Sequence, residues 1–344
     1  MTTNKRLPFA LLQATRLMRA GRLVEATADI QRILRQPSTS DAVVDGQVRD
    51  AVLPTGVEGQ PGNFIASSHT NQAGTRPYKL YIPSGYTGKA QPLIVMLHGC
   101  TQTPDDFAAG TRMNSLAEER QLFVLYPAQT AAANGSRCWN WFKGSDQHRD
   151  RGEPAIIAGM TREVLDRYGI EIGKVYVAGL SAGGAMAAVM GATYPDLYAA
   201  IGVHSGLAAG SAHDLPSAFA AMRGTPPSSP PVRARAARAV PVIVFHGEQD
   251  TTVHRRNGEQ VISQCGGGNA ASSNDVSVEQ GQVPGGHAYT RTLQADPTGR
   301  VIHEHWLVHG AGHAWSGGSI LGSYTDPKGP DATRAMVRFF HQVV

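Results

Sequence analysis

The sequence predicts an α/β fold, with a mostly parallel, doubly wound sheet, helices on both of its faces, and a short helical hairpin at the N-terminus. Two observations carry this prediction. Continuous apolar runs typical of buried central strands recur from about residue 76 onward, and segments of helical periodicity separate them. Strands that alternate with helices pair in parallel, because each helix returns the chain across one face of the sheet.

The first 75 residues depart from this pattern. Residues 9–35 have the periodicity of two short helices with a break at Ala20-Gly21. A single hairpin cannot bury its own apolar face, so we expect it to pack on the main domain, to self-associate with another subunit, or to dock on an apolar surface. The predicted organisation is a hairpin at 1–40, a linker with an early strand at 41–75, and one large domain at 76–344.

Within the large domain, each element follows from its residue pattern. The first strand alternates in polarity like an antiparallel strand, and the later ones are apolar runs that burial on both faces requires. The Pro-rich segment 225–231 excludes a helix or an inner strand, so 207–239 should form a surface excursion, either a lid or an inert loop. The expected strands are 78–82, 93–97, 122–126, 175–178, 199–203, 240–245 and 301–308, and the expected helices are 154–168, 184–191 and 331–343.

Composition narrows the class of protein. Of the 344 residues, 41% are hydrophobic and 17% are charged, which supports a large core and argues against extended disorder. The net charge of +4 comes without interleaved aromatic and basic residues, so no nucleic-acid partner is expected. The chain has no run of eighteen apolar residues, so no membrane span is expected, and its N-terminus shows no secretory signal pattern.

The segment Gly179-Leu180-Ser181-Ala182-Gly183 says most about chemistry. It lies between an apolar run and a run rich in Ala, Met and Gly, which predicts a strand, a sharp turn and a helix. A serine on such a turn presents its hydroxyl at the carboxyl end of the sheet, beside the free N–H groups of the helix. Ser181 is therefore the candidate nucleophile.

A serine nucleophile needs a general base, and the base needs a carboxylate that sets its tautomer. In this type of sheet the chain order is serine, acid and then histidine, each after a strand. Asp250, which follows the strand at 240–245, is the candidate acid, with Glu248 and Asp214 as rivals. His313, which follows the last strand, is the candidate base among 13 histidines.

Four other histidines need an interpretation. His204 and His246 are expected to make structural hydrogen bonds near the site. His303 and His305 share one face of their strand, where they either pack in the core or bind zinc. No carboxylate or open-site geometry is evident for zinc, so we expect no metal. The proposed chemistry also needs no cofactor.

The reaction needs two N–H donors for the negative charge that develops on the substrate oxygen. Ala182 is expected to supply one, and Cys100, on the loop after a central strand, the other. Three cysteines are present without metal spacing. Cys100 and Cys138 either form a disulfide or remain two reduced thiols, and the state of Cys265 stays open.

Six segments, taken in order, resemble the polyhydroxybutyrate depolymerase family of esterases, which is related to feruloyl and acetylxylan esterases. The likeness runs from about residue 76 to the C-terminus. The segments are Leu97-His98-Gly99-Cys100-Thr101-Gln102, Tyr126-Pro127-Ala128-Gln129, Cys138-Trp139-Asn140-Trp141-Phe142, Gly179-Leu180-Ser181-Ala182-Gly183-Gly184, His246-Gly247 with Asp250 and Val253, and Gly312-His313-Ala314-Trp315.

The resemblance implies an α/β-hydrolase fold and a catalytic set of Ser181, Asp250 and His313. It implies hydrolysis of short-chain hydroxyalkanoate polyesters or oligomers through an acyl-enzyme, with feruloyl or acetyl esters of plant polysaccharide as the alternative substrates. A peptidase, or a non-catalytic binding protein on a hydrolase scaffold, is a more distant interpretation. The resemblance favours an extracellular protein, but without a visible signal peptide a cytoplasmic one stays open.

Aromatic residues close to these motifs are candidates for the substrate groove. By the resemblance, Trp139, Trp141, Trp315 and His98 are expected to line it, since exposed aromatic faces would bind a polyester chain or a phenolic ring. The alternative is that Trp139 and Trp141 pack in the core, because tryptophan usually buries most of its area.

Overall fold

The structure, a computed structural model, describes residues 62–225, 240–265 and 276–343. All of these belong to one compact unit, Gly59–Val344. The helical hairpin predicted at 1–40 lies outside the described residues, as do the linker up to residue 61 and residues 226–239 of the predicted excursion. The first strand of the sheet begins at Asn63, in the segment that the sequence assigned to a linker with an early strand.

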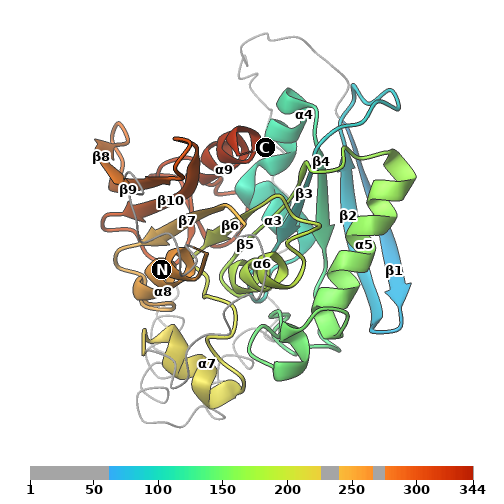
Figure 1. The fold of residues 1–344 in the computed structure, drawn as a ribbon, viewed down its shortest axis with the longest axis horizontal. Helices are drawn as coiled ribbons and strands as arrows, with labels where there is room; N and C mark the ends of the chain where they lie inside the picture. The colour runs from blue at the N-terminus through green and yellow to red at the C-terminus, as the bar shows by residue number, and fades with distance from the viewer. Residues whose placement is uncertain (1–61, 226–239, 266–275, 344) are drawn as a thin grey trace, which may run out of the picture. The chain divides into compact units, whose positions relative to one another are not determined.

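A ten-stranded sheet forms the centre of this unit (Figure 1). Its strands are β1 (Asn63–Asn71), β2 (Gly74–Ile82), β3 (Leu93–Leu97), β4 (Phe123–Pro127), β5 (Val175–Leu180), β6 (Ala200–His204), β7 (Val242–Gly247), β8 (Val276–Gln282), β9 (Ala288–Ala295) and β10 (Val301–Val308). The spatial order is β1-β2-β4-β3-β5-β6-β7-β10-β9-β8. Neighbours from β4 to β10 pair in parallel, and the outer strands on both sides pair antiparallel. The carboxyl ends of β3, β5, β6, β7 and β10 therefore meet at one edge of the sheet.

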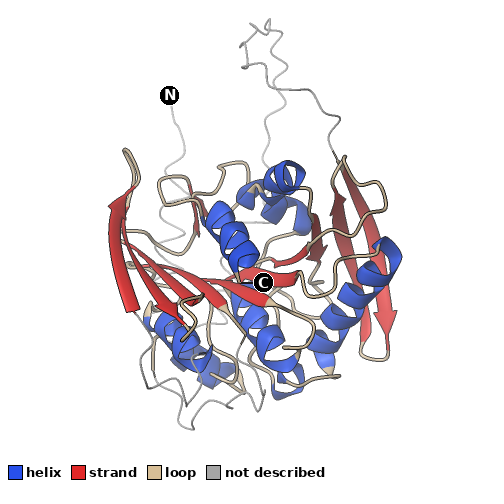
Figure 2. Cartoon of the chain, turned by 45° about the horizontal axis from the view of Figure 1, so that its top comes forward, coloured by secondary structure: helices blue, strands red, loops and turns tan. Residues whose placement is uncertain are grey.

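Helices cover both faces of this sheet (Figure 2). They are α3 (Pro104–Thr111), α4 (Met113–Arg120), α5 (Gly152–Tyr168), α6 (Ala182–Thr193), α7 (Leu215–Met222), α8 (Arg256–Cys265) and α9 (Ala332–Gln342), with a 3₁₀ turn η1 at Gly144–Gln147. Successive residues of β3 point to opposite faces, so Val95 and Leu97 join the buried cluster under α5 and α6, while Ile94 and Met96 join the one under α3, α4 and α9. The prediction of a mostly parallel, doubly wound sheet with helices on both faces is confirmed.

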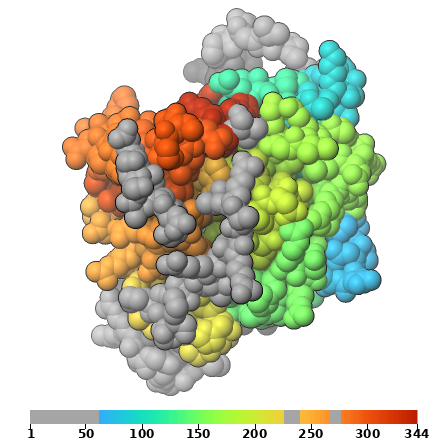
Figure 3. All heavy atoms as spheres, viewed as in Figure 1, coloured from blue at the N-terminus to red at the C-terminus, as the bar shows by residue number. Residues whose placement is uncertain are grey.

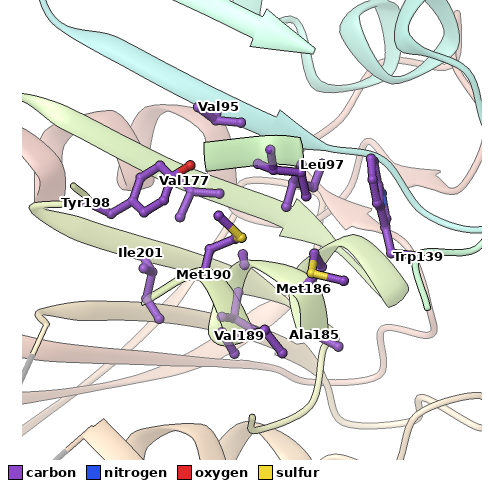
Figure 4. Packing of buried hydrophobic residues seen from close by; sticks show 14 of the residues in the cluster. Val95, Leu97, Trp139, Val177, Ala185, Met186, Val189, Met190, Tyr198 and Ile201 are labelled. Carbon is purple, nitrogen blue, oxygen red and sulfur yellow. The ribbon is translucent and has the colours of Figure 1, made fainter. Parts of the chain in front are cut away.

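The helix α6 packs tightly against the central strands. Its side chains Met186 and Met190 point toward Leu97 of β3 and Val177 of β5 (Figure 4). The rest of α6 is mainly glycine and alanine, which lets its backbone approach the sheet: a Cβ on Gly184 would lie only 3.0 Å from the carbonyl oxygens of Gly179 and His204. This packing fixes the turn that precedes α6.

The excursion predicted at 207–239 begins with the short helix α7, which the sequence interpretation missed. Asp214 caps α7, because its side chain accepts a hydrogen bond from the Ser217 N–H at 2.8 Å. The helix lies at the surface (yellow in Figure 3), and its Leu215 and Phe219 are exposed. Whether the excursion acts as a lid stays a prediction. None of the described helices combines the length and apolar character that a membrane span requires.

Candidate active site

Ser181 lies on a strained turn between β5 and α6. Its φ of +57° and ψ of −118° are outside the regions that residues with a side chain normally adopt. The turn is too tight for side chains at its neighbours, since a Cβ on Gly179 would lie 2.4 Å from the Gly183 carbonyl carbon, and one on Gly183 would lie 2.0 Å from the Leu97 oxygen. The strain is the local geometry that the G-x-S-x-G pattern predicts for an exposed nucleophile.

Two backbone N–H groups near this turn are available for a ligand. Ala182 is the first residue of α6, and the first hydrogen bond of the helix runs from Ala185 to Ser181, so the Ala182 N–H points out of the helix end. Among the described residues, neither the Ala182 nor the Cys100 N–H has an acceptor. Since β3 and β5 are adjacent, the loop that carries Cys100 lies beside the Ser181 turn.

A disulfide joins Cys100 to Cys138, across 38 residues of chain. The Thr101 N–H donates to the Ser136 oxygen at 2.7 Å, which ties the same two segments together a second time. On the other side of the loop, the Gln102 side chain accepts from the Gly99 N–H at 2.8 Å. The disulfide and these two hydrogen bonds therefore hold the backbone on both sides of Cys100.

The carboxylate of Asp250 contacts His313 directly. Oδ2 of Asp250 lies 2.7 Å from Nδ1 of His313, and Oδ1 accepts the N–H groups of Thr252 at 2.9 Å and Val253 at 2.8 Å. Burial by itself raises the pKa of Asp250, but the hydrogen bond and charge of His313 and the Val253 N–H outweigh it, so the pKa is lowered. The ionised carboxylate keeps a proton on Nδ1 of His313 and leaves Nε2 free to accept one.

The two rival acids have other roles. Glu248, on the same loop as Asp250, accepts the Gly310 N–H at 3.3 Å and lies 3.4 Å from His309. Asp214 caps α7. Neither contacts His313 in the described structure.

The loops that carry Asp250 and His313 are joined through their backbones. Gln249 N–H donates to the Ala311 oxygen at 2.9 Å, and Glu248 N–H donates to the Val308 oxygen at 2.9 Å. A Cβ on Gly247 would lie 2.3 Å from the Gly312 oxygen, so only glycine permits this approach. The acid and the base thus form one rigid pair at the carboxyl ends of β7 and β10.

His204, the last residue of β6, connects this pair to the nucleophile turn. Its carbonyl oxygen accepts the Ser181 N–H at 2.8 Å, and its Nε2 accepts the Ser316 N–H, three residues after His313, at 2.9 Å. Burial lowers the pKa of His204 to about 3, so the ring is neutral and Nε2 can accept. The Ser181 hydroxyl makes no hydrogen bond to another described residue; in unliganded enzymes the contact between nucleophile and base is often long and shortens on binding.

The expectation of an exposed aromatic groove is wrong for the four residues that the sequence proposed. Trp139, Trp141, Trp315 and His98 are 0%, 5%, 1% and 1% exposed. Trp139 lies in the cluster between α6 and the sheet (Figure 4), and its Nε1 donates to the His98 oxygen at 3.1 Å. The apolar area of each ring is buried, and the polar edges of three find internal partners, which is the core-packing alternative.

His98 and Trp315 support the loops around the site instead. His98 donates from Nδ1 to the Gly99 oxygen at 2.7 Å and accepts the Gln129 N–H on Nε2 at 3.0 Å. Burial lowers its pKa to about 4, which keeps it in this neutral form. Trp315, two residues after His313, donates from Nε1 to the Thr333 hydroxyl at 3.0 Å.

One supporting residue, Glu153, was missed in the sequence. It is buried at the start of α5 and accepts the Asn140 N–H at 2.7 Å and the Asn140 side-chain amide at 2.6 Å. It also accepts a hydrogen bond from the Gln129 side chain. Burial raises its pKa, as expected for a carboxylate removed from water. Glu153 thus holds the segment that carries Cys138, although nothing in its local sequence marks it.

No group of three or more His, Cys, Asp or Glu side chains within the described ranges is arranged to hold a metal ion. His303 makes a hydrogen bond with the Gln294 side chain at 2.9 Å. Cys265 is unpaired and partly buried, and burial raises its thiol pKa to about 12.

The geometry above is that of an α/β-hydrolase. Among solved structures, the chain resembles an acetyl xylan esterase from Aspergillus awamori, with a TM-score of 0.61 and 23% sequence identity, over 72% of this chain and 94% of that one. This likeness shows the fold, which is the α/β-hydrolase fold expected from the sequence.

A family model described as "Esterase PHB depolymerase" matches residues 76–275, and the chain belongs to this family. It is 31% identical over 265 residues to poly(3-hydroxyalkanoate) depolymerase C of Paucimonas lemoignei, across 73% of this chain and 62% of that protein. It is 29% identical over 235 residues to a probable acetylxylan esterase A of Neosartorya fischeri, across 64% of this chain and 62% of that protein. The chain thus spans about three fifths of the length of these two curated relatives.

Proposed function

We propose that this chain is a serine esterase in which Ser181 is the nucleophile, His313 the general base and Asp250 the acid. One observation carries the proposal: the buried Asp250 carboxylate lies 2.7 Å from Nδ1 of His313, at the sheet edge where Ser181 sits on its strained turn. Membership of the esterase PHB depolymerase family supports the same chemistry.

In the proposed reaction, the Ser181 oxygen attacks the ester carbonyl while Nε2 of His313 takes its proton. The N–H groups of Cys100 and Ala182 donate to the negatively charged oxygen of the tetrahedral intermediate. The imidazolium then protonates the leaving alkoxide, which leaves an acyl group on Ser181. Water, deprotonated by His313, attacks this acyl-enzyme and releases the acid.

The proposed substrates are polyesters or oligomers of short-chain hydroxyalkanoates. The family model and the depolymerase from Paucimonas lemoignei support this class. Esters of plant polysaccharide are the second candidate, which the acetylxylan esterase relatives support. Turnover on amorphous polyhydroxybutyrate, methyl ferulate and acetylated xylan, measured with one preparation, separates them. A kcat/KM for either plant ester above that for hydroxybutyrate oligomers would contradict the polyester assignment.

The catalytic proposal is tested by labelling with a fluorophosphonate and by p-nitrophenyl butyrate hydrolysis. Ser181→Ala should lose both while keeping the melting temperature of the wild type. Ser115→Ala, which removes the exposed hydroxyl of a serine on α4, is the matched control and should keep both. Labelling at a residue other than Ser181, or full turnover by Ser181→Ala, refutes the assignment, and an unlabelled, inactive wild type favours a non-catalytic binding protein.

We also propose an extracellular location. The Cys100–Cys138 disulfide supports it, because disulfides persist in oxidising compartments. Immunodetection in the culture medium and in the cell fraction of the source organism tests the proposal. Protein confined to the cells with both thiols reduced would contradict it.

A further inference from the structure

His246, the fifth residue of β7, lies beside the Asp250 carboxylate and faces Oδ2, the oxygen that His313 also contacts. Its side chain is completely buried, and its Nε2 is 2.8 Å from the Val253 oxygen and 3.5 Å from Oδ2 of Asp250. Because a carbonyl oxygen only accepts, Nε2 must carry the ring proton. Val253 is also the residue whose N–H donates to Oδ1 of Asp250. His246 and Asp250 therefore hold Val253 from its two polar groups and close the turn that aims the carboxylate.

The opposite nitrogen of this ring is unaccounted for. Nδ1 of His246 is buried and has no hydrogen-bond partner in the described part of the chain, and the same is true of Nε2 of His305 on the neighbouring strand β10. Burial lowers the pKa of both rings, that of His305 to about 4, so both are neutral near pH 7. Nδ1 of His246 is then a bare acceptor, and buried acceptors in proteins are almost always paired.

Both orphan nitrogens lie beside one point above Gly258, in the first turn of α8. A Cβ placed on Gly258 would be 3.1 Å from Nδ1 of His246, 3.1 Å from Nε2 of His305 and 3.3 Å from Cγ1 of Val244. This point lies one bond length from the Gly258 Cα, so the backbone of Gly258 itself packs against both ring nitrogens and leaves little room for a side chain. An alanine at residue 258 would fill this point with a methyl group.

We propose that His246 is a positioning residue for the Asp250 carboxylate: its Nε2 proton, which faces both the Val253 oxygen and Oδ2 of Asp250, holds closed the turn that aims the carboxylate at His313. The inference rests on the proposed esterase function. These two acceptors keep the ring proton of His246 on Nε2. With the opposite tautomer, a lone pair on Nε2 would face the Val253 oxygen and Asp250, and the repulsion would open the turn.

The closing experiment compares two substitutions of similar polarity. In His246→Gln, the side-chain amide reaches the position of Nε2 and can still donate to the Val253 oxygen. In His246→Asn, the shorter amide reaches only the position of Nδ1. We expect His246→Gln to keep kcat on p-nitrophenyl butyrate within about threefold of the wild type, and His246→Asn to lose about tenfold or more, with KM changed by less than twofold in both.

A third variant displaces the His246 ring without changing a polar group, because a Cβ on Gly258 would press against it. Gly258→Ala is expected to lower kcat about tenfold, although a glycine-to-alanine change inside a helix normally stabilises it. Gly144→Ala, where an added Cβ meets nothing within 4 Å, is the control and should leave kcat unchanged. A crystal structure at high resolution should show the His246 ring displaced in Gly258→Ala relative to the wild type.

The outcomes separate this inference from the proposed function. An active wild type whose His246→Asn and His246→Gln variants have equal kcat refutes the positioning role. If neither variant folds, Gly258→Ala decides, since full kcat in that variant refutes the positioning role. A wild type that hydrolyses no ester and takes no fluorophosphonate refutes the esterase function itself.

Discussion

The contact between Asp250 and His313 allows one substitution to be worked out in detail. In the native structure, Oδ1 of Asp250 accepts two backbone N–H groups and Oδ2 faces Nδ1 of His313. In Asp250→Asn, the single amide oxygen must stay on the two N–H groups, since turning the NH₂ toward them would set donor against donor. The NH₂ then faces His313, whose Nδ1 must accept. The ring proton moves to Nε2, and the base can no longer take a proton from Ser181.

The expected loss can be estimated in two ways. Two unit charges about 4 Å apart interact by about 4 kcal/mol at an effective dielectric near 20, so removing the carboxylate charge opposite the imidazolium costs about 10³-fold in rate. The wrong tautomer alone lowers kcat by about 10⁴-fold in serine hydrolases with this triad. We therefore expect kcat to fall between about 10³- and 10⁴-fold, with little change in KM.

The assay is p-nitrophenyl butyrate hydrolysis at pH 8, with the rate of fluorophosphonate labelling as a second readout that should fall in parallel. The matched control is Glu248→Gln, which neutralises a carboxylate two residues away that accepts from Gly310 rather than His313. This control should keep kcat within about threefold, as for a partly exposed ion pair. A kcat for Asp250→Asn within tenfold of the wild type would refute the assignment of Asp250 and the tautomer argument with it.

Three further predictions follow from the same structure. Gly183→Ala should prevent folding or lower the melting temperature by more than 10 °C, because its Cβ would lie 2.0 Å from a backbone oxygen of β3. Thermal unfolding followed by circular dichroism measures this, and a melting temperature equal to that of the wild type would contradict it. Replacing Cys100 and Cys138 by serine should lower the free energy of unfolding by roughly 4 kcal/mol, because the disulfide closes a loop of 38 residues in the unfolded chain. Urea titration measures this, and an unchanged midpoint would show that the disulfide adds no stability. Burial lowers the pKa of His98 to about 4 and of His204 to about 3, below the value near 6.5 expected in the unfolded chain. The unfolded state therefore binds more protons than the folded state below pH 6.5. Each ring should remove about 1.4 kcal/mol of folding stability per pH unit as the pH falls from about 6.5 to 4. Equal urea midpoints at pH 7.5 and pH 5 would contradict this.

Much of the fold was predictable because its signals are local. The strand at 301–308 was predicted with the bounds of β10, and the helices at 154–168 and 331–343 lie within two residues of α5 and α9 at each end. The strand, turn and helix around Ser181 follow from residues that are adjacent in the chain. The elements that were missed, such as α7 and the outer strands β8 and β9, are short or at least partly exposed, and they carry little apolar periodicity.

The sequence by itself determined the α/β class, the strained serine turn, and an acid and a histidine placed after later strands, since apolar periodicity and glycine spacing are properties of neighbouring residues. Only the tertiary structure decided which side chains meet. It paired His313 with Asp250 rather than Glu248, buried Trp139 and Trp141, and made His204 the link between the nucleophile turn and the base loop. These outcomes depend on the order of the strands in the sheet, which brings together residues 63 and 112 positions apart in the chain. No local pattern encodes that order, because it is set by how the whole core packs.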